Sequence, residues 1–137
     1  MKLFLNDPTS LALQNALTGL SLRQQVISNN LANLNTPGFK AARVSFEAEL
    51  RNALEEVADP LPLQTTHADH FGAAPTALDA VQPSVQTLND RSLRLDGNNV
   101  DLERELAELT ETVIRFQAST QLMARKIMLL RSVISGR

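Results

Sequence analysis

One short stretch of the sequence gathers side chains of the kinds that bind metal ions. His67, Asp69 and His70 lie within four residues, and two imidazoles with one carboxylate could hold zinc with one position open. Prolines flank the stretch, however, and no second shell that would orient the imidazoles is visible beside it. We therefore expect a role in loop structure or subunit contact and no metal site. Stoichiometric metal in the purified protein would instead favour a metal-dependent hydrolase.

Acidic pairs are the other candidates for catalysis. Glu55 with Glu56, and Asp101 with Glu103 and Glu105, could act as acid and base. On exposed helices such residues are more often solvated, or they complement the positive N-terminal end of the helix. The sequence contains no cysteine, no glycine-rich phosphate loop and no serine with a histidine nearby to activate it. We predict that the protein is not an enzyme, with no catalytic residue and no cofactor.

Length and charge exclude several other classes. The 137 residues suffice for one domain, and the net charge of −2 gives no basic surface for nucleic acid or anionic lipid. The first residues, MKLFLN, contain too few apolar residues for the apolar region of a signal peptide. No apolar stretch of the sequence is long enough to span a membrane. We expect a single unit over residues 1–137, with no nucleic-acid partner, no direct lipid binding and no cleavable signal.

Residues 8–35 are predicted to form a long N-terminal helix. Asn6 or Asp7 can cap its start, Pro8 suits the first turn, and the sequence Thr-Pro-Gly at 36–38 ends it. Between Pro8 and Phe39 the only charged residue is Arg23. With Gln24 admitted, apolar residues recur alternately four and three apart, which predicts a helix seam at Leu13, Leu17, Leu20, Ile27, Leu31 and Leu34.

Residues 101–135 predict a second and longer helix with a stronger repeat. Acidic residues lie in its first turn and basic residues toward its end, as the helix dipole favours. Its seam keeps the same alternation, which is typical of coiled coils, with Thr120 as the only polar member. The apolar seam positions are Leu102, Leu106, Leu109, Val113, Phe116, Met123, Ile127, Leu130 and Ile134.

The middle segment, residues 36–100, shows little sustained periodicity. Four of the six prolines lie between residues 60 and 83. A short helix is predicted near 45–57, and Leu93 with Leu95 alternate like a short strand that ends in a turn at Asp96 and Gly97. A connection of this length is usually functional or disordered.

These elements predict a mainly α fold in which two long terminal helices pack as an antiparallel, coiled-coil-like hairpin joined by the irregular segment. At about 1.5 Å per residue the helices are roughly 40 and 50 Å long, far beyond the radius of a compact chain of this size, about 14 Å. The nearly uncharged first helix indicates cover by neighbouring subunits, because the centres of interfaces are depleted in charge. The alternative is a simple hairpin whose Ser and Gln side chains face water.

Two motifs give the sequence a family resemblance. The run NNLANLNTPGFK at 29–40 resembles the N-terminal signature of the bacterial flagellar rod, hook and hook-associated proteins. The run GNNVDLERE at 97–105 resembles the segment that opens the C-terminal helix of the rod members. By its length and by the residues at 20–24 and 44–50, the chain is most similar to the short subunits of the proximal rod, a sister rod subunit being the nearest alternative. The assembly motif that this resemblance implies comprises Asn30, Leu31, Ala32, Asn33, Thr36, Pro37, Gly38 and Phe39.

The resemblance implies a structural axial subunit of the flagellar basal body that builds the tubular rod between the inner-membrane ring and the distal rod and hook. The partners it implies are further copies of the chain, the rod proteins FlgC and FlgF, the adaptor FliE, the inner-membrane ring and the flagellar type III export apparatus. The implied location is the basal body within the periplasmic space, reached without a cleavable signal. The alternative function is a soluble helical adaptor or export chaperone of the flagellar system.

Overall fold

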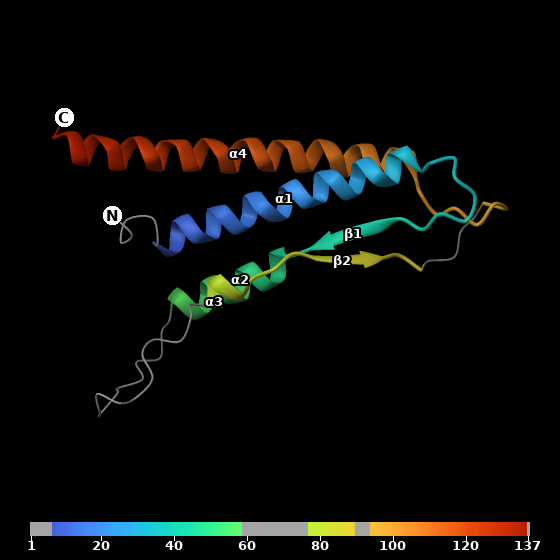
Figure 1. The fold of residues 1–137 in the computed structure, drawn as a ribbon, viewed down its shortest axis with the longest axis horizontal. Helices are drawn as coiled ribbons and strands as arrows, with labels where there is room; N and C mark the ends of the chain where they lie inside the picture. Colours follow the sequence, from blue (N-terminus) through green and yellow to red (C-terminus); the bar gives the residue numbers. More distant parts are fainter. Residues whose placement is uncertain (1–6, 59–76, 90–93, 137) are drawn as a thin grey trace, which may run out of the picture.

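The computed structural model describes residues 7–58, 77–89 and 94–136. Its two long helices, α1 (Pro8–Ala32) and α4 (Leu102–Ser135), lie side by side and run in opposite directions (Figure 1). The structure is mainly helical, which confirms the predicted fold class. None of its described helices is long and apolar enough to cross a membrane.

The middle segment forms a small layer on the side of α1 opposite α4 (Figure 1). Strands β1 (Ala42–Ser45) and β2 (Ser84–Thr87) pair antiparallel, with Ala42 opposite Thr87 and Ser45 opposite Ser84. Helix α2 (Glu47–Ala58) follows β1, and the single turn α3 (Ala77–Ala80) precedes β2. The layer supplies α1 with part of the cover that we expected from other subunits.

The short strand predicted at Leu93 and Leu95 is wrong at Leu95, and the described strands lie at 42–45 and 84–87 instead. Leu95 lies in a turn with Asp96, and Leu93 lies outside the described residues. Gly97 follows with a φ of +76°, a conformation that favours glycine, so the alternation of apolar residues here belongs to a turn. The residues that do pair, at 42–45 and 84–87, are too few and too polar to show a clear alternating pattern.

Both long helices have defined ends. Asp7 precedes α1 in an extended conformation and Pro8 occupies its first turn, while Asn33 follows its last residue. α1 therefore ends at Ala32, before the predicted end at residue 35. Asp101 caps α4 by accepting hydrogen bonds from the backbone N–H groups of Glu103 and Arg104, and Gly136 closes the helix with a φ of 66°.

The core lies where α1 crosses the junction of β1 and α2. Leu20, Val44 and Phe46 form its buried cluster, and Phe116 of α4 packs against it. Gly19 lies directly under the Phe46 ring: a Cβ at this position would come 2.7 Å from two of the ring carbons. The glycine is therefore required for the close approach of Phe46 to α1.

Arg23, the one charged residue of α1, binds this junction from the same helix. Its guanidinium donates to the carbonyl of Val44 at 2.9 Å and to Glu47 at 2.7 Å. Its Cζ lies 5.0 Å from the centroid of the Phe46 ring, within the range of a cation–π contact. Burial is the largest single influence and acts to raise the pKa of Glu47, but the hydrogen bond and charge of Arg23 together with backbone hydrogen bonds outweigh it, so the pKa is lowered. The only cation of α1 thus fixes the point where β1 becomes α2.

Candidate functional site

Asn30 of the predicted assembly motif joins three elements. It is 1% exposed, and its Nδ2 donates to the carbonyl of Ala42 in β1 at 2.9 Å and to Oε2 of Glu105 in α4 at 3.0 Å. Its Oδ1 accepts from the backbone N–H of Ala42 at 3.0 Å. Both amide hydrogens and the carbonyl oxygen are therefore used, and the side chain holds the end of α1 to the start of the sheet and to α4.

Glu105 is a buried carboxylate, 3% exposed, in the first turns of α4. Its pKa is raised, chiefly because burial removes water from the charged form, and the negative charge of Glu108 adds to this effect. The hydrogen bond from Asn30 and the charges of Arg43 and Arg104 act in the opposite direction. This residue was expected to complement the helix dipole; the structure gives it a structural contact between the two helices instead.

Asn98 joins the second motif to the first. It is 0% exposed, and its Nδ2 lies 2.9 Å from the carbonyl oxygen of Asn33, 3.0 Å from that of Leu34 and 2.9 Å from that of Thr36. These carbonyl groups belong to the turn that follows α1, so the amide gathers the end of the helix into one compact loop. Its own Oδ1 accepts from the backbone N–H of Val100 at 2.7 Å.

Neighbouring residues of the second motif hold the chain that leaves this loop. Asn99 accepts from the backbone N–H of Ala41 at 2.7 Å and donates to the carbonyl of Leu88 at 2.9 Å. The backbone N–H of Gly38 donates to the carbonyl of Asp96 at 2.8 Å, and Lys40 donates to that of Gly97 at 2.9 Å. The two motifs, more than fifty residues apart in the sequence, therefore form one hydrogen-bonded junction.

Asp96 and Asn33 complete the junction from its two sides. The backbone N–H of Asn98, followed by the Arg94 side chain, lowers the pKa of Asp96. Asn33 donates to the carbonyl of Asn29 at 2.8 Å and accepts from Thr36 at 3.2 Å. Of the predicted motif, Asn30 is buried, Leu31, Asn33 and Phe39 are half-buried, and Ala32, Thr36, Pro37 and Gly38 are exposed.

The predicted helix seam divides into covered and uncovered residues. In α1, Leu20 and Ile27 are buried and Leu13, Leu17, Leu31 and Leu34 are half-buried. In α4, Leu109, Val113, Phe116, Met123 and Leu130 are half-buried, whereas Leu102, Leu106, Ile127 and Ile134 are 45%, 47%, 53% and 76% exposed. The seam as a contact surface between subunits stays a prediction.

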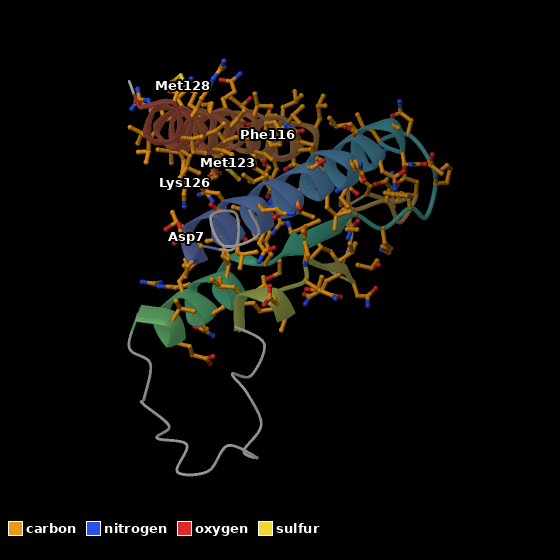
Figure 2. All side chains as sticks on the ribbon, turned by 60° about the vertical axis from the view of Figure 1, so that its left-hand side comes forward. Asp7, Phe116, Met123, Lys126 and Met128 are labelled. Atoms are coloured by element: carbon orange, nitrogen blue, oxygen red, sulfur yellow. The ribbon has the colours of Figure 1, made fainter. Side chains whose placement is uncertain are left out.

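The residues of α4 that face α1 most directly each precede a predicted seam position by one residue. Glu105 and Thr112 are buried there, Ser119 is half-buried, and Lys126 pairs with Asp7 at the start of α1. In Figure 2 Met123 and Lys126 lie on the side of α4 toward α1, and Met128 lies on the far side. Both lines repeat every seven residues, so periodicity alone could not distinguish them.

Comparison with known proteins identifies the family. Residues 11–40, which cover most of α1 and the loop after it, match the family model described as flagella basal body rod protein. The chain is 35% identical over 124 residues to the flagellar basal body rod protein FlgB of Bacillus subtilis, covering 90% of this chain and 91% of that one. This chain belongs to the FlgB family. The FlgB of Borreliella burgdorferi is 36% identical over 77% of this chain and 79% of its own, and that of Salmonella typhimurium is 27% identical over 90% of each.

The FlgB relatives carry the name of rod proteins, and the acidic residues considered above for catalysis cap a helix, form an ion pair or lie exposed in the described part of the chain. Among residues 7–58, 77–89 and 94–136, no three acidic or histidine side chains come together to hold a metal ion. His67, Asp69 and His70 lie outside that part of the chain. Of the acidic pairs, Asp101 caps α4, Glu103 is exposed, and Glu55 forms an exposed ion pair with Arg51 at 3.4 Å.

Sequence reasoning missed the partners within the FlgB-family junction. The resemblance assigned residues 97–105 only to the start of the C-terminal helix and Asn30 only to the assembly motif, so it predicted no contact between the two motifs. The available signal was the number of asparagines in both motifs, because an amide supplies donor and acceptor together and suits the closing of loops. Gly19 gave a similar signal, since glycine inside a helix costs about 1 kcal/mol relative to alanine and usually has a packing reason.

Proposed function

We propose that this chain is a structural axial subunit of the proximal rod, assembling through its terminal helices into the tube that connects the inner-membrane ring to the distal rod and hook. One observation carries the proposal beyond the family name: from its first turn to its last, α4 carries large apolar side chains that the rest of the described chain leaves exposed. Its exposed members are Leu102, Leu106, Ile114, Leu122, Ile127, Met128, Leu129, Val133 and Ile134.

An uncovered surface of this kind is unusual for a protein that acts alone. Monomeric soluble proteins rarely expose large contiguous apolar patches, and those that exist usually bind partners. Here the exposed residues follow α4 over its 34 residues, a length of about 50 Å. A partner that covers them must itself be elongated, as the α1–α4 pair of another subunit is.

The partners and location follow from the same proposal. Neighbouring subunits would be further copies, the rod proteins FlgC and FlgF, the adaptor FliE and the inner-membrane ring. The chain would reach the periplasmic part of the basal body through the flagellar export apparatus, without a cleavable signal. The name of the relatives, flagellar basal body rod protein FlgB, supports a place in the rod of the basal body.

Fractionation of flagellated cells tests the proposal. A rod subunit co-purifies with detergent-resistant basal bodies, and removing residues 8–34 abolishes its incorporation and the motility of the cells. A chain found only in the soluble fraction would indicate the alternative, a helical adaptor or export chaperone. Normal rods and motility without residues 8–34 would overturn the proposal directly.

A further inference from the structure

Helix α4 continues well beyond the end of its partner helix. Lys126 forms an ion pair with Asp7, at the residue that precedes α1 (Figure 2). Past this contact α4 runs on from residue 127 to residue 135, about 13 Å, and no segment of the described ranges lies alongside it (Figure 1). We call residues 127–135 the overhang.

The overhang is apolar along one broad side. Ile127, Leu129, Val133 and Ile134 are 53%, 69%, 79% and 76% exposed. Together with Leu130 they cover nearly half of the helix circumference at 100° per residue, and this side continues the line of α4 that faces α1. The side of α4 that α1 covers further along thus becomes apolar where α1 has ended.

A groove of matching length lies between α1 and α2. Ala12, Leu13 and Ala16 of α1 form one wall and Leu50, Leu54 and Val57 of α2 form the other, around a volume of about 430 Å³. The α1 wall runs from Pro8 to Ala16, about 12 Å, so it accommodates a helical segment as long as the overhang.

The charges of the two segments are complementary. Arg131 of the overhang and Arg125, just before it, form no ion pair with any other described residue, and the overhang contains no carboxylate. Helix α2 has four glutamates against one arginine, and two of these glutamates, Glu49 and Glu56, form no ion pair within the described chain. Opposite charges on the two segments favour their encounter and disfavour contact between two like segments.

A chain cannot fill its own groove, because α1 lies between α4 and α2 (Figure 1). We propose that the overhang of one copy docks into the α1–α2 groove of a second copy. Since the two surfaces differ, each copy keeps one free overhang and one free groove, and the contact can repeat into an open polymer. This inference rests on the proposed function in taking copies of the chain as neighbours in the rod.

Cysteine cross-linking in assembled basal bodies tests the contact, because the natural chain contains no cysteine. Cells produce two variants together, Val133→Cys on the overhang and Leu54→Cys on the groove wall; both positions are partly exposed, so the fold of each chain is spared. Isolated basal bodies are treated with a short bismaleimide. We expect a cross-linked pair several-fold more abundant than with the control, in which Glu103→Cys near the start of α4 replaces Val133→Cys.

Each outcome decides a different claim. Equal cross-linking in the test and control pairs, or none in basal bodies that contain both chains, overturns the docking and leaves the rod function intact. Absence of the wild-type chain from basal bodies overturns the proposed function itself. A third pair, Phe4→Cys with Leu54→Cys, detects the N-terminal segment as a rival occupant; a stronger cross-link there would also overturn the docking.

Discussion

The ring of Phe46 rests on the backbone of α1 at Gly19, at a distance that leaves no room for a side chain there. A Cβ on Gly19 would lie 2.7 Å from Cγ and Cδ1 and 2.8 Å from Cδ2 of the ring. Phe46 is 3% exposed and belongs to the core cluster, so its ring cannot turn outward without opening the core. The approach of α2 to α1 depends on this single glycine.

Gly19→Ala should destabilise the protein although it improves helix propensity. The added methyl group forces the Phe46 ring out of place, and such overpacking costs about 1–3 kcal/mol, against which the propensity gain of about 1 kcal/mol counts in part. Urea denaturation of the two proteins measures the difference. The rescue variant Gly19→Ala with Phe46→Leu makes room for the methyl group, so the two changes should be less destabilising together than the sum of their separate effects. Strict additivity would contradict the packing described here.

Asn98→Asp should be among the most damaging single changes in the chain. It replaces the Nδ2 donor by an oxygen that faces the carbonyl oxygens of Asn33, Leu34 and Thr36. Leaving buried polar groups unpaired costs about 1–3 kcal/mol, and more for a charge. The expected result is a loss of about 3 kcal/mol or more in the free energy of unfolding.

Asn35→Asp is the matched control, because Asn35 lies in the same loop and its side chain is exposed. The same chemical change there should alter the free energy of unfolding by less than about 0.5 kcal/mol. If both variants lose the same stability, the loop tolerates no added charge and the role of Asn98 is not specific.

Glu105→Gln should stabilise the protein at neutral pH by an amount that shrinks in acid. The pKa of Glu105 is raised in the folded protein, so at neutral pH the folded state is destabilised by a buried charged carboxylate. As the pH falls through this raised pKa, the carboxylate gains a proton in the folded protein. The destabilisation is therefore gone once the pH is below the ordinary pKa of 4.5. The glutamine oxygen still accepts from Asn30 and carries no charge. Free energies of unfolding across this pH range, for wild type and variant, measure the effect.

The control for this prediction is Glu103→Gln, which removes the same charge from an exposed position of the same helix turn. Subtracting its effect corrects for the change in net charge. A constant difference between Glu105→Gln and wild type from neutral pH to below 4.5 would show that burial does not raise the pKa of this carboxylate.

Charges introduced on the two sides of α4 should separate folding from assembly. Leu106 is 47% exposed, so Leu106→Asp should leave the isolated chain nearly as stable as wild type and yet prevent incorporation into basal bodies. Phe116 packs against the core, so Phe116→Asp should lower stability as well as incorporation. Leu109 is half-buried like Phe116, so Leu109→Asp should also lower both stability and incorporation.

Glu111→Gln, at an exposed position off the seam, should leave both properties close to wild type. Circular dichroism of the purified chains and the protein content of isolated basal bodies measure the two effects separately. Normal incorporation of Leu106→Asp would mean that Leu106 meets no neighbouring subunit.

The long helices were predictable because their signal is local and repeated many times. Periodicity, Pro8 and the acidic first turn of α4 each concern residues within a few positions of one another. The class of fold followed from them. Which side of α4 meets α1 did not, because Glu105 and Leu106 differ by one residue and both belong to a seven-residue repeat.

The small sheet and the junction could not be predicted, since their interactions join residues far apart in the sequence. Ala42 pairs with Thr87, and Asn98 binds carbonyl groups more than sixty residues earlier. Each strand has four residues, too few to establish a period. The motifs pointed to the correct residues, but only their spatial contact revealed that Asn30 and Asn98 act in one structure.

Because Arg23 is committed to Val44, Glu47 and Phe46, the outward side of α1 has no charge of either sign. Its exposed residues, among them Gln14, Thr18, Gln25 and Ser28, are neutral. Contacts made through this side involve no charge of α1, so salt has no charge of α1 to screen there. Contacts that depend on the charges of Arg125 and Arg131 weaken as salt screens them. In a polymer of such subunits, high salt should therefore weaken the contacts at the C-terminal ends of α4 before those made through α1.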